Sequence, residues 1–371
     1  MKILITGSNG FVGKNLAANL SLCAGWDLLL FDLPQTVEDL QSLVAQTDFV
    51  FHLAGVNRPR NPDEFQSGNI GLTGILLNML EGENRKIPLV LSSSTQAELD
   101  NPYGISKKQA EELVFDYGRK TGAPIYVYRF PNVFGKWCKP NYNSVVATFC
   151  HNAANNIPLR IDDPGKEMIL LYIDDIVDEF LEILNDKISP CYGSFVRNPQ
   201  TSKVTLGELA DTIASFARSR RTLTLDYNMN NRLAKQLYAT FLSYAVQDDL
   251  AVAADMKCDE RGFFAELIRS PFFGQVSVSR TKPGVTRGNH WHNTKVEKFV
   301  VIEGEAIISL RRIDSDEVVE YHVSGNDIRI VDIPPGCTHN IKNTGSTDVL
   351  TIFWSNEIFD PKKPDTQINE V

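Results

Sequence analysis

Two histidines and a glutamate in the C-terminal third of the chain have the residue types and the spacing of metal ligands. His290 and His292 are separated by one residue, so on a strand their side chains lie on the same face. Glu297 follows closely and can reach that face from the next strand or turn. Two imidazoles and a carboxylate bind a divalent transition metal. The segment 334–339, which ends in His339, offers a fourth ligand.

A tyrosine and a lysine in the N-terminal half have the spacing of a catalytic pair. On a helix, Tyr103 and Lys107 share one face. We expect the lysine cation to lower the pKa of the tyrosine, so that the phenol exchanges a proton near neutral pH. Ser94, at the end of the preceding apolar run, can hydrogen-bond the same oxygen. The pattern predicts proton transfer coupled to hydride transfer from a nicotinamide.

The beginning of the chain has the pattern of a dinucleotide-binding turn. An apolar run over 2–6 is followed by Gly7, Gly10 and Gly13 and then by a helical stretch. Glycines allow the backbone to approach a pyrophosphate, and the helix N-terminus offers free N–H groups. Asp32 ends the next apolar run and can bond a ribose hydroxyl. Its charge repels a 2′-phosphate, which favours NAD over NADP.

The elements that position these residues follow two different rhythms. Apolar runs alternate with helical stretches in the first part, which predicts an α/β Rossmann-like domain with a doubly wound parallel sheet. From about residue 246 short strands and turns predict an all-β barrel. We therefore predict an NAD(P)-binding domain over 1–245 and a metal-binding domain over 246–371. The apolar runs of the first domain are 1–6, 28–31, 48–55, 88–94 and 124–129.

Composition excludes several classes of protein. The chain has 371 residues, of which 43% are hydrophobic and 22% charged, as expected for two globular domains. A net charge of −9 argues against nucleic acid as a partner. The sequence has no signal-peptide pattern and no apolar run near the ~20 residues that span a bilayer. The six cysteines are scattered, so we expect a reducing, cytoplasmic location. Because no apolar run is long enough to span a bilayer, we expect no membrane partner.

The histidine region resembles the two cupin motifs. The segment 284–304 matches Gly-x5-His-x-His-x4-Glu-x6-Gly, and the segment 334–343 matches Pro-x-Gly-x2-His-x3-Asn. The resemblance implies a small double-stranded β-helix barrel with a metal inside it. Zinc is the simplest choice, and the iron of cupin dioxygenases fits the same ligands. The implied ligands are His290, His292, Glu297 and His339.

The stretch 1–211 resembles the extended short-chain dehydrogenase/reductase (SDR) family, in its sugar-nucleotide branch. The resemblance is carried by the glycine-rich turn, His-Leu-Ala-Gly over 52–55, Tyr-x-x-x-Lys over 103–107 and Arg-Phe-Pro-Asn-Val-Phe-Gly over 129–135. It implies catalysis by Ser94, Tyr103 and Lys107 and places Asn132 near the sugar nucleotide. Because Ser94 is close to Tyr103 in sequence, Ser93 is the alternative to Ser94. The implied cofactor contacts are Gly7, Gly10, Phe11, Val12, Gly13, Asp32, Leu53, Ala54 and Lys107.

Two segments of the second domain resemble nucleotide-sugar 3- and 3,5-epimerases that act on 4-keto-6-deoxy hexoses. They are Asp-x-Arg-Gly-x-Phe-x-Glu over 259–266 and Arg-Gly-x-His over 287–290. The resemblance implies that Arg261 and Arg287 contact the substrate. The histidine of those enzymes is a general base, but a metal-bound His290 nitrogen is not free to take a proton. The base therefore stays open, with three candidates: Tyr321, His322 and Lys342.

In this order, the two halves are similar to one bifunctional family, the CapF type of capsular polysaccharide and O-antigen enzymes. The resemblance implies that the barrel epimerises C3 of a UDP-2-acetamido-2,6-dideoxy-4-hexulose. The first domain then reduces the C4 ketone to UDP-2-acetamido-2,6-dideoxy-L-talose, on the route to UDP-N-acetyl-L-fucosamine. NADPH, zinc and a homodimer are also implied, although Asp32 suits NAD better. The alternative is a single-activity reductase whose metal-bound barrel serves dimerisation or sensing.

Overall fold

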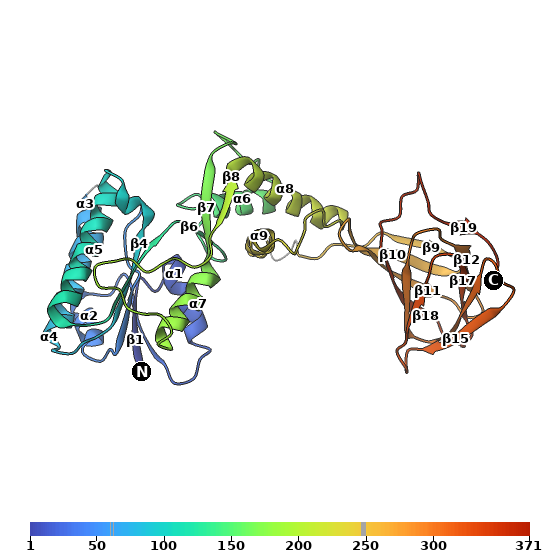
Figure 1. Cartoon of the computed structure of the whole chain (residues 1–371), viewed down its shortest axis with the longest axis horizontal. Coiled ribbons are helices and arrows are strands. Elements are labelled where there is room, and N and C mark those ends of the chain that lie inside the picture. The colour runs from blue at the N-terminus through green and yellow to red at the C-terminus, as the bar shows by residue number, and fades with distance from the viewer. Residues whose placement is uncertain (60, 62, 246–249) are drawn as a thin grey trace. The chain divides into compact units, whose positions relative to one another are not determined.

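The structure, a computed structural model, describes residues 1–59, 61, 63–245 and 250–371. They form two compact units, which Figure 1 shows with their elements labelled. The first comprises Met1–Ile213 and Lys235–Ala245, and the second comprises Ala214–Ala234 and the described part of Val246–Val371. The predicted boundary at 245/246 borders residues outside the described ranges and stays a prediction.

A five-stranded parallel sheet with the order β2-β1-β3-β4-β5 forms the centre of the first unit. Its strands alternate with helices along the chain, which confirms the predicted Rossmann-like fold. The strands are β1 (Lys2–Thr6), β2 (Asp27–Phe31), β3 (Phe49–His52), β4 (Leu89–Ser94) and β5 (Ile125–Phe130). The helices against the sheet are α1 (Phe11–Leu20), α2 (Val37–Val44), α4 (Leu72–Gly82), α5 (Pro102–Thr121) and α7 (Ile173–Leu184).

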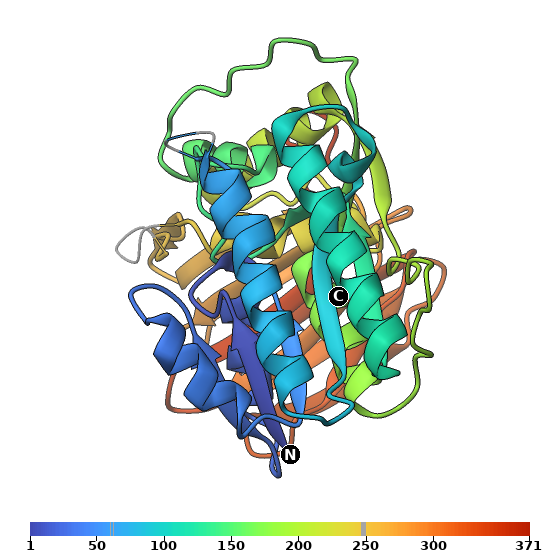
Figure 2. The same cartoon turned by 90° about the vertical axis from the view of Figure 1, so that its left-hand side faces the viewer.

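Both faces of this sheet are buried, which explains why its strands are apolar on both sides. On β1, Leu4 belongs to a cluster with residues of α2, α4 and α5. Its neighbours Ile3 and Ile5 belong to a cluster with α1 and α7. Figure 2 shows α4 and α5 in front of the strands. Because the strands are parallel, the turns that follow them meet at one edge of the sheet.

Helix α5, which carries Tyr103 and Lys107, has clear signals at both ends. The Asn101 side chain accepts a hydrogen bond from the Gly104 N–H at 2.9 Å, and Pro102 occupies the first turn. Gly122 ends the helix in the left-handed conformation at φ 68°. The Asn101 cap fixes where the helix starts relative to the end of β4, and Gly122 fixes where the helix ends.

The remaining elements of the chain before the barrel include a three-stranded sheet with the order β6-β7-β8. None of the helices in the described ranges has both the length and the apolar character needed to cross a membrane. These elements are β6 (Asn132–Phe134), β7 (Glu167–Tyr172), β8 (Ser202–Thr205), α3 (Asp63–Phe65), the π-helix η1 (Gln66–Gly71), the 3₁₀ helix η2 (Thr95–Glu98), α6 (Val145–Ala154), α8 (Leu206–Thr222) and α9 (Arg232–Leu242).

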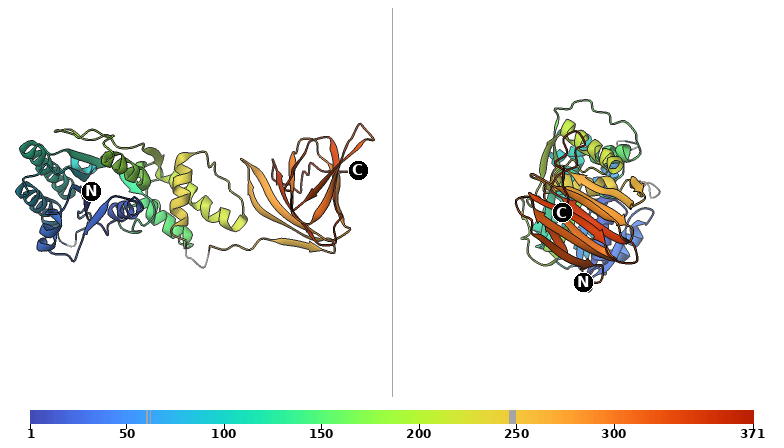
Figure 3. Two further views of the ribbon diagram at one scale, coloured as in Figure 1. Left: turned by 90° about the horizontal axis from the view of Figure 1, so that it is seen from below. Right: turned by 90° about the vertical axis from the view of Figure 1, so that its right-hand side faces the viewer.

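The second unit contains two antiparallel sheets whose strands curve around a common interior (Figure 3). One has the order β16-β13-β18-β11-β10-β9 and the other β15-β14-β17-β12-β19. The predicted cupin-like β domain is confirmed. The strands are β9 (Met256–Asp259), β10 (Gly262–Ser270), β11 (Gly274–Thr281), β12 (Thr286–Trp291), β13 (Glu297–Glu303), β14 (Glu305–Arg312), β15 (Val318–Ser324), β16 (Ile330–Ile333), β17 (Cys337–Asn343), β18 (Val349–Ser355) and β19 (Gln367–Ile368).

The interior of this barrel is apolar on one side and polar on the other. Phe299, Ile308 and Ile341 belong to a buried hydrophobic cluster drawn from β13, β14, β15, β16, β17 and β18. Apart from Gly274, the buried positions of β11 instead carry a glutamine, two serines and a threonine: Gln275, Ser277, Ser279 and Thr281. A buried polar wall of this kind suits a polar ligand better than a packed core.

Candidate functional sites

The glycine-rich turn joins β1 to α1 at the carboxyl edge of the parallel sheet. Gly7 has φ 71°, and a Cβ atom there would lie 2.6 Å from the Ala54 nitrogen. A Cβ atom at Gly13 would lie 2.1 Å from the Gly7 oxygen, so only glycine fits. Gly10 begins α1 without a side-chain cap, which leaves the first N–H groups of the helix for another partner. The turn therefore has the features of a pyrophosphate site.

Asp32 closes the turn from the end of β2. One carboxylate oxygen accepts from the Asn9 N–H at 2.7 Å and the other from the Leu33 N–H at 2.8 Å. Each oxygen has a second lone pair, which a ribose hydroxyl can use. Asp32 thus holds the turn in place and stays available to a cofactor. The predicted contacts Phe11, Val12 and Leu53 pack against the cluster of α1 and α7.

The predicted catalytic side chains Ser94, Tyr103 and Lys107 converge where β4 ends and α5 begins. The Ser94 side chain lies close enough to the Tyr103 phenol to lower its pKa. The Lys107 Nζ lies 5.9 Å from the centre of the Tyr103 ring and donates to the Ser92 carbonyl at 3.2 Å. The alternative residue, Ser93, points to the other face of β4. There it donates to the buried Glu111 carboxylate, so Ser94 is the serine that faces Tyr103.

The pKa of the tyrosine differs in direction from our expectation. Burial raises the pKa of Tyr103, although the Ser94 side chain opposes this effect. Burial also lowers the pKa of Lys107 to about 8, and the charge of Glu111 acts against that change. The expected lowering of the tyrosine pKa is therefore wrong for this site, because desolvation of the buried phenol is the largest effect on its pKa. At neutral pH the phenol keeps its proton, as a proton donor requires.

A cavity of the first unit lies beside the predicted substrate residue Asn132. Asn132 donates to the Ile169 carbonyl at 3.3 Å. Ile169 and Pro131, the residue before Asn132, line a cavity of about 680 Å³. The segment Arg197–Thr201 also lines it. We did not single out that segment from the sequence. The signal that could have identified this segment is an arginine close to two amide side chains, Asn198 and Gln200.

Two lysines take part in the contacts of the loop that follows Asn132 along the chain. Lys136 forms an ion pair with Asp174, and the Lys14 Nζ lies 5.0 Å from the centre of the Trp137 ring. Trp137 remains 46% exposed. A flat, exposed ring beside two lysines is suited to stack on a base.

Four predicted metal ligands come together inside the barrel. His290 on β12 is the register partner of His339 on β17, and His292 follows the end of β12. Glu297 begins β13 in the other sheet, so the cluster joins the two sheets. The ligand atoms of the four side chains all lie within 4.8 Å of one another. This spread approaches that of ligands around one ion with bonds of ~2 Å.

The hydrogen bonds of two imidazoles show that the cluster suits a cation. The His292 Nδ1 contacts the Asp365 carbonyl, and the His339 Nδ1 lies 3.2 Å from the Cys337 carbonyl. A carbonyl only accepts, so both Nδ1 atoms carry a proton, and in the neutral imidazoles that a metal binds both Nε2 atoms present lone pairs. These Nε2 atoms lie 3.2 and 3.3 Å from one oxygen of Glu297, which is also an acceptor. Three lone pairs that converge in this way fit a metal ion.

The third imidazole, His290, is also suited to be a neutral ligand. Burial, and then the neighbouring His339 and His292, lower the pKa of His290 to about 4. A metal binds the neutral form of imidazole, which this environment favours at physiological pH.

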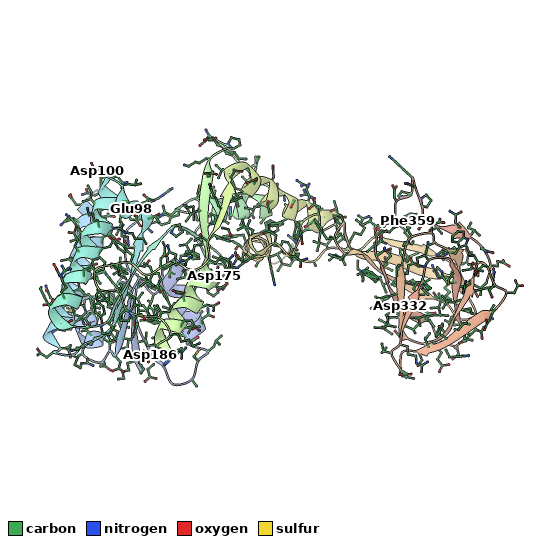
Figure 4. The ribbon with its side chains drawn as sticks, in the orientation of Figure 1. Glu98, Asp100, Asp175, Asp186, Asp332 and Phe359 are labelled. Carbon is green, nitrogen blue, oxygen red and sulfur yellow. The ribbon has the colours of Figure 1, made fainter. Side chains whose placement is uncertain are left out.

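A cavity of about 330 Å³ opens beside the metal cluster. His290 and Glu297 line it together with the polar side chains of β11, namely Gln275, Ser277 and Ser279. Phe359, labelled in Figure 4, also contributes to its wall. The cavity therefore places the predicted metal cluster and a wall of hydrogen-bonding groups around one space.

The two arginines predicted to contact the substrate occupy different positions. Arg287 lines the cavity, and its Nε is a buried donor without a partner among the described residues. Arg261 is 52% exposed and donates to Asp259, whose carboxylate lies 3.5 Å from Arg287. Arg261 is therefore not among the residues that line the cavity, and Asp259 links it to Arg287, which does line it. The three candidates for the base are exposed to solvent: Tyr321, His322 and Lys342.

Comparison with known proteins agrees with this arrangement. Residues 3–192 match the NAD-dependent epimerase/dehydratase family, and residues 257–367 match the polysaccharide biosynthesis C-terminal domain. The chain is 43% identical, over 99% of its length and 98% of the relative, to UDP-2-acetamido-2,6-beta-L-arabino-hexul-4-ose reductase of Pseudomonas aeruginosa.

Solved structures give the same picture. The crystal structure of the capsular polysaccharide assembling protein CapF from Staphylococcus aureus matches with a TM-score of 0.93 and 46% identity, and the match covers 100% of both chains. UDP-glucuronic acid 4-epimerase from Bacillus cereus with NAD matches 66% of this chain and 98% of its own, at a TM-score of 0.56 and 18% identity. The second match shows the fold alone.

Proposed function

Because the chain belongs to the NAD-dependent epimerase/dehydratase family, and over its full length to the CapF-type capsular polysaccharide enzymes, we propose that it is a bifunctional UDP-sugar enzyme. In this proposal the barrel epimerises C3 of a UDP-2-acetamido-2,6-dideoxy-4-hexulose. The first unit then reduces the C4 ketone with NAD(P)H to UDP-2-acetamido-2,6-dideoxy-L-talose, on the route to UDP-N-acetyl-L-fucosamine.

The reduction is assigned to the side chains at the end of β4 and the start of α5. Bound NAD(P)H supplies the hydride. The Tyr103 phenol donates a proton to the C4 oxygen, and the Ser94 hydroxyl, which lies beside that phenol, orients the same oxygen. Lys107 holds a positive charge behind the tyrosine. The raised pKa of Tyr103 supports this direction of proton transfer, since the phenol is protonated at neutral pH.

The sugar nucleotide of the reductase half is assigned to the cavity beside Asn132. Its lining residue Arg197 can bind a diphosphate, and Asn132 lies where the sugar would enter. The cofactor is proposed to be NADPH by resemblance, with NADH as the alternative because of Asp32. Comparison of kcat/KM for NADPH and NADH decides between them. The homodimer stays a prediction, which light scattering of the intact chain tests.

The epimerisation is assigned to the barrel cavity. The observation that carries this half is that the His290/Glu297 side of the metal cluster and the polar wall of β11 line one cavity. Its volume, about 330 Å³, is at the lower end of the ~300–1,000 Å³ usual for small-molecule sites, so it suits a sugar ring better than a whole nucleotide sugar. Zinc held by the four ligands would supply positive charge to stabilise the negative charge that develops when C3 loses its proton.

The proton carrier for C3 is drawn from side chains that line this cavity or from water. Among the described residues, the ionisable lining side chains outside the metal cluster are Lys257, Glu266, Arg287 and Lys295. Arg287 is the best placed to neutralise charge on the substrate, because its buried Nε lacks a protein partner in the described chain.

Proton exchange tests the proposal. The Tyr103→Phe variant is incubated in D2O with a UDP-2-acetamido-4-keto-6-deoxy hexose and no nicotinamide, with and without a chelator, and followed by NMR. We expect deuterium at C3 without the chelator and none with it. A Glu297→Gln variant should also fail to exchange, while wild-type protein with chelator still reduces the ketone when NAD(P)H is added.

The opposite outcomes identify the alternatives. Reduction without any exchange at C3 would leave a single-activity reductase whose barrel serves dimerisation or sensing. Consumption of oxygen by the iron-loaded protein would indicate an oxygenase instead.

A further inference from the structure

The C-terminal segment of the chain, 365–370, lies against the loop that connects two of the metal ligands. The carboxylate of Asp365 accepts five hydrogen bonds from this loop, three of them from backbone N–H groups. The Oδ1 atom accepts from the N–H and the side-chain amide of Asn293, at 2.9 and 2.8 Å. The Oδ2 atom accepts from the N–H and hydroxyl of Thr294, at 2.8 and 3.1 Å, and from the N–H of Lys295 at 3.0 Å.

The position of this loop matters because it separates His292 from Glu297. Three consecutive loop residues are fixed through one carboxylate, so the distance between the two ligands depends on Asp365. The backbone of the same residue acts on a ligand directly, since its carbonyl accepts from the His292 Nδ1. This bond sets the tautomer of the imidazole and leaves its Nε2 lone pair towards the cluster.

The segment after Asp365 extends this contact along β12. Strand β19 pairs with β12 and places Ile368 opposite His290. The Asn369 N–H donates to the Asn289 carbonyl at 3.0 Å, and Arg311 donates to the Glu370 carbonyl at 2.7 Å. The C-terminal segment is thus hydrogen-bonded beside His290 as well as beside His292.

We propose that residues 365–370 form a latch over the metal site, in which Asp365 is a positioning residue that sets His292 and Glu297 for the ion. The inference rests on the metal site of the proposed function. Without the latch, the loop 293–295 would have to become ordered when the ion binds, and the His292 ring would lose its fixed tautomer. Both changes reduce metal affinity, because ordering has an entropy cost and partners of the ligands orient them.

Competition for zinc against a chromophoric chelator, with the full-length chain, tests the latch. We expect Asp365→Ala to lower zinc affinity by roughly 10- to 100-fold, as is usual when a partner of a metal ligand is lost. Asp365→Asn should lie between wild type and the alanine variant, since it preserves one acceptor oxygen. The matched control is Asp360→Ala, five residues before Asp365 and outside the latch. The Asp360 carboxylate accepts from the N–H of its near neighbour Lys362 at 2.9 Å, and it makes no hydrogen bond to the loop 293–295 in the described chain, so zinc affinity should be unchanged.

A second measurement separates positioning from general loss of structure. In metal-free protein, the ¹⁵N shifts of the His292 ring should show a proton on Nδ1 in wild type and a mixture of tautomers in Asp365→Ala. The conservative Asp365→Asn variant serves if the alanine variant does not fold. Wild-type zinc affinity in both Asp365 variants overturns the latch and leaves the proposed function intact. Absence of zinc binding by the wild-type chain overturns both.

Discussion

Glu111 and Arg129 form a bidentate ion pair next to Lys107 of the Ser94–Tyr103–Lys107 site. The Nε and one terminal nitrogen of Arg129 donate to the two oxygens of Glu111 at 2.9 and 2.6 Å. Glu111 is 2% exposed and lies one helical turn after Lys107 on α5. Its charge therefore acts on two cations, one of which is the lysine that we assign to catalysis.

The first prediction concerns the pH dependence of reduction. Burial lowers the pKa of Lys107 to about 8, and Glu111 opposes that change. Since the reductase site needs the lysine cation, kcat/KM should fall as the pH rises through about 8. In Glu111→Gln the charge that raises the pKa of Lys107 is gone, so the lysine loses its proton at lower pH. The fall of kcat/KM at alkaline pH (the alkaline limb of the profile) should therefore begin at a lower pH than in wild type. Initial rates of NAD(P)H oxidation across a pH series measure this shift.

Glu98→Gln is the control for this prediction. Glu98, labelled in Figure 4, also pairs with Arg129, at 3.1 Å, but it is exposed and is not among the groups that act on Lys107. Its alkaline limb should coincide with that of wild type. If folded Glu111→Gln loses kcat/KM at the same alkaline pH as wild type, Glu111 does not have this role.

The second prediction separates two adjacent serines. Ser94→Ala should lower kcat of reduction by roughly 10- to 100-fold, because the phenol and the substrate oxygen lose their hydrogen-bond partner. Ser93→Ala should leave kcat nearly unchanged. Instead it should lower the free energy of unfolding by about 1–2 kcal/mol, since the buried Glu111 loses a donor. Steady-state kinetics and urea unfolding of both variants provide the test, and equal kinetic losses would refute the assignment.

Much of the first unit could be predicted because each of its elements carries a local signal. Apolar runs mark the parallel strands, and Asn101, Pro102 and Gly122 mark the ends of α5. The choice between Ser93 and Ser94 could not be made in this way. It depends on which side of β4 faces Tyr103, and sequence spacing does not contain that information.

The barrel shows more clearly where local patterns are insufficient. Along β11, polar residues alternate with Val276 and Val278, a pattern that by itself indicates polar side chains towards water. The structure buries the polar set and leaves the valines half-buried. A ligand cavity explains this reversal, and a single sequence gives no sign of it. Asp365 could not be predicted either, because its partners at 293–295 are distant in the chain and contact it only in the fold.

The third prediction concerns acid stability and rests on His52. This buried imidazole lies between the hydroxyls of Thr6 and Thr73, at 2.7 and 2.8 Å, and burial lowers its pKa to about 3. The unfolded chain takes up the proton near the ordinary value of 6.5, whereas the folded chain does not. Stability is therefore fully present above about pH 6.5 and is lost as the pH falls towards 3.

Urea unfolding between pH 7 and 4 measures this effect. Wild type should lose up to about 1.4 kcal/mol per pH unit from this residue once the pH is below the unfolded pKa. His52→Gln retains a donor and an acceptor between the threonines but cannot titrate, so its stability should depend less on pH. Parallel curves for the two proteins would show that His52 contributes nothing to acid sensitivity.

The fourth prediction is that loss of the Ser279 hydroxyl preserves or raises stability but lowers activity. Its hydroxyl is 1% exposed, lines the barrel cavity and has no hydrogen-bond partner in the described ranges. An unpaired buried hydroxyl costs ~1–3 kcal/mol, so Ser279→Ala should unfold at equal or higher urea concentration than wild type. If the hydroxyl binds the sugar, the same variant should lose roughly 10-fold in kcat/KM for exchange at C3, because one such bond contributes ~1.4 kcal/mol.

Thr281→Val is the matched control on the same face of β11. The Thr281 hydroxyl is equally buried and likewise lacks a partner among the residues described, but Thr281 is not among the residues that line the cavity. Its removal should stabilise the barrel and leave exchange at C3 unchanged. Equal kinetic effects at both positions would mean that β11 acts through packing of the barrel wall. A loss confined to Ser279→Ala would identify its hydroxyl as a contact to the sugar.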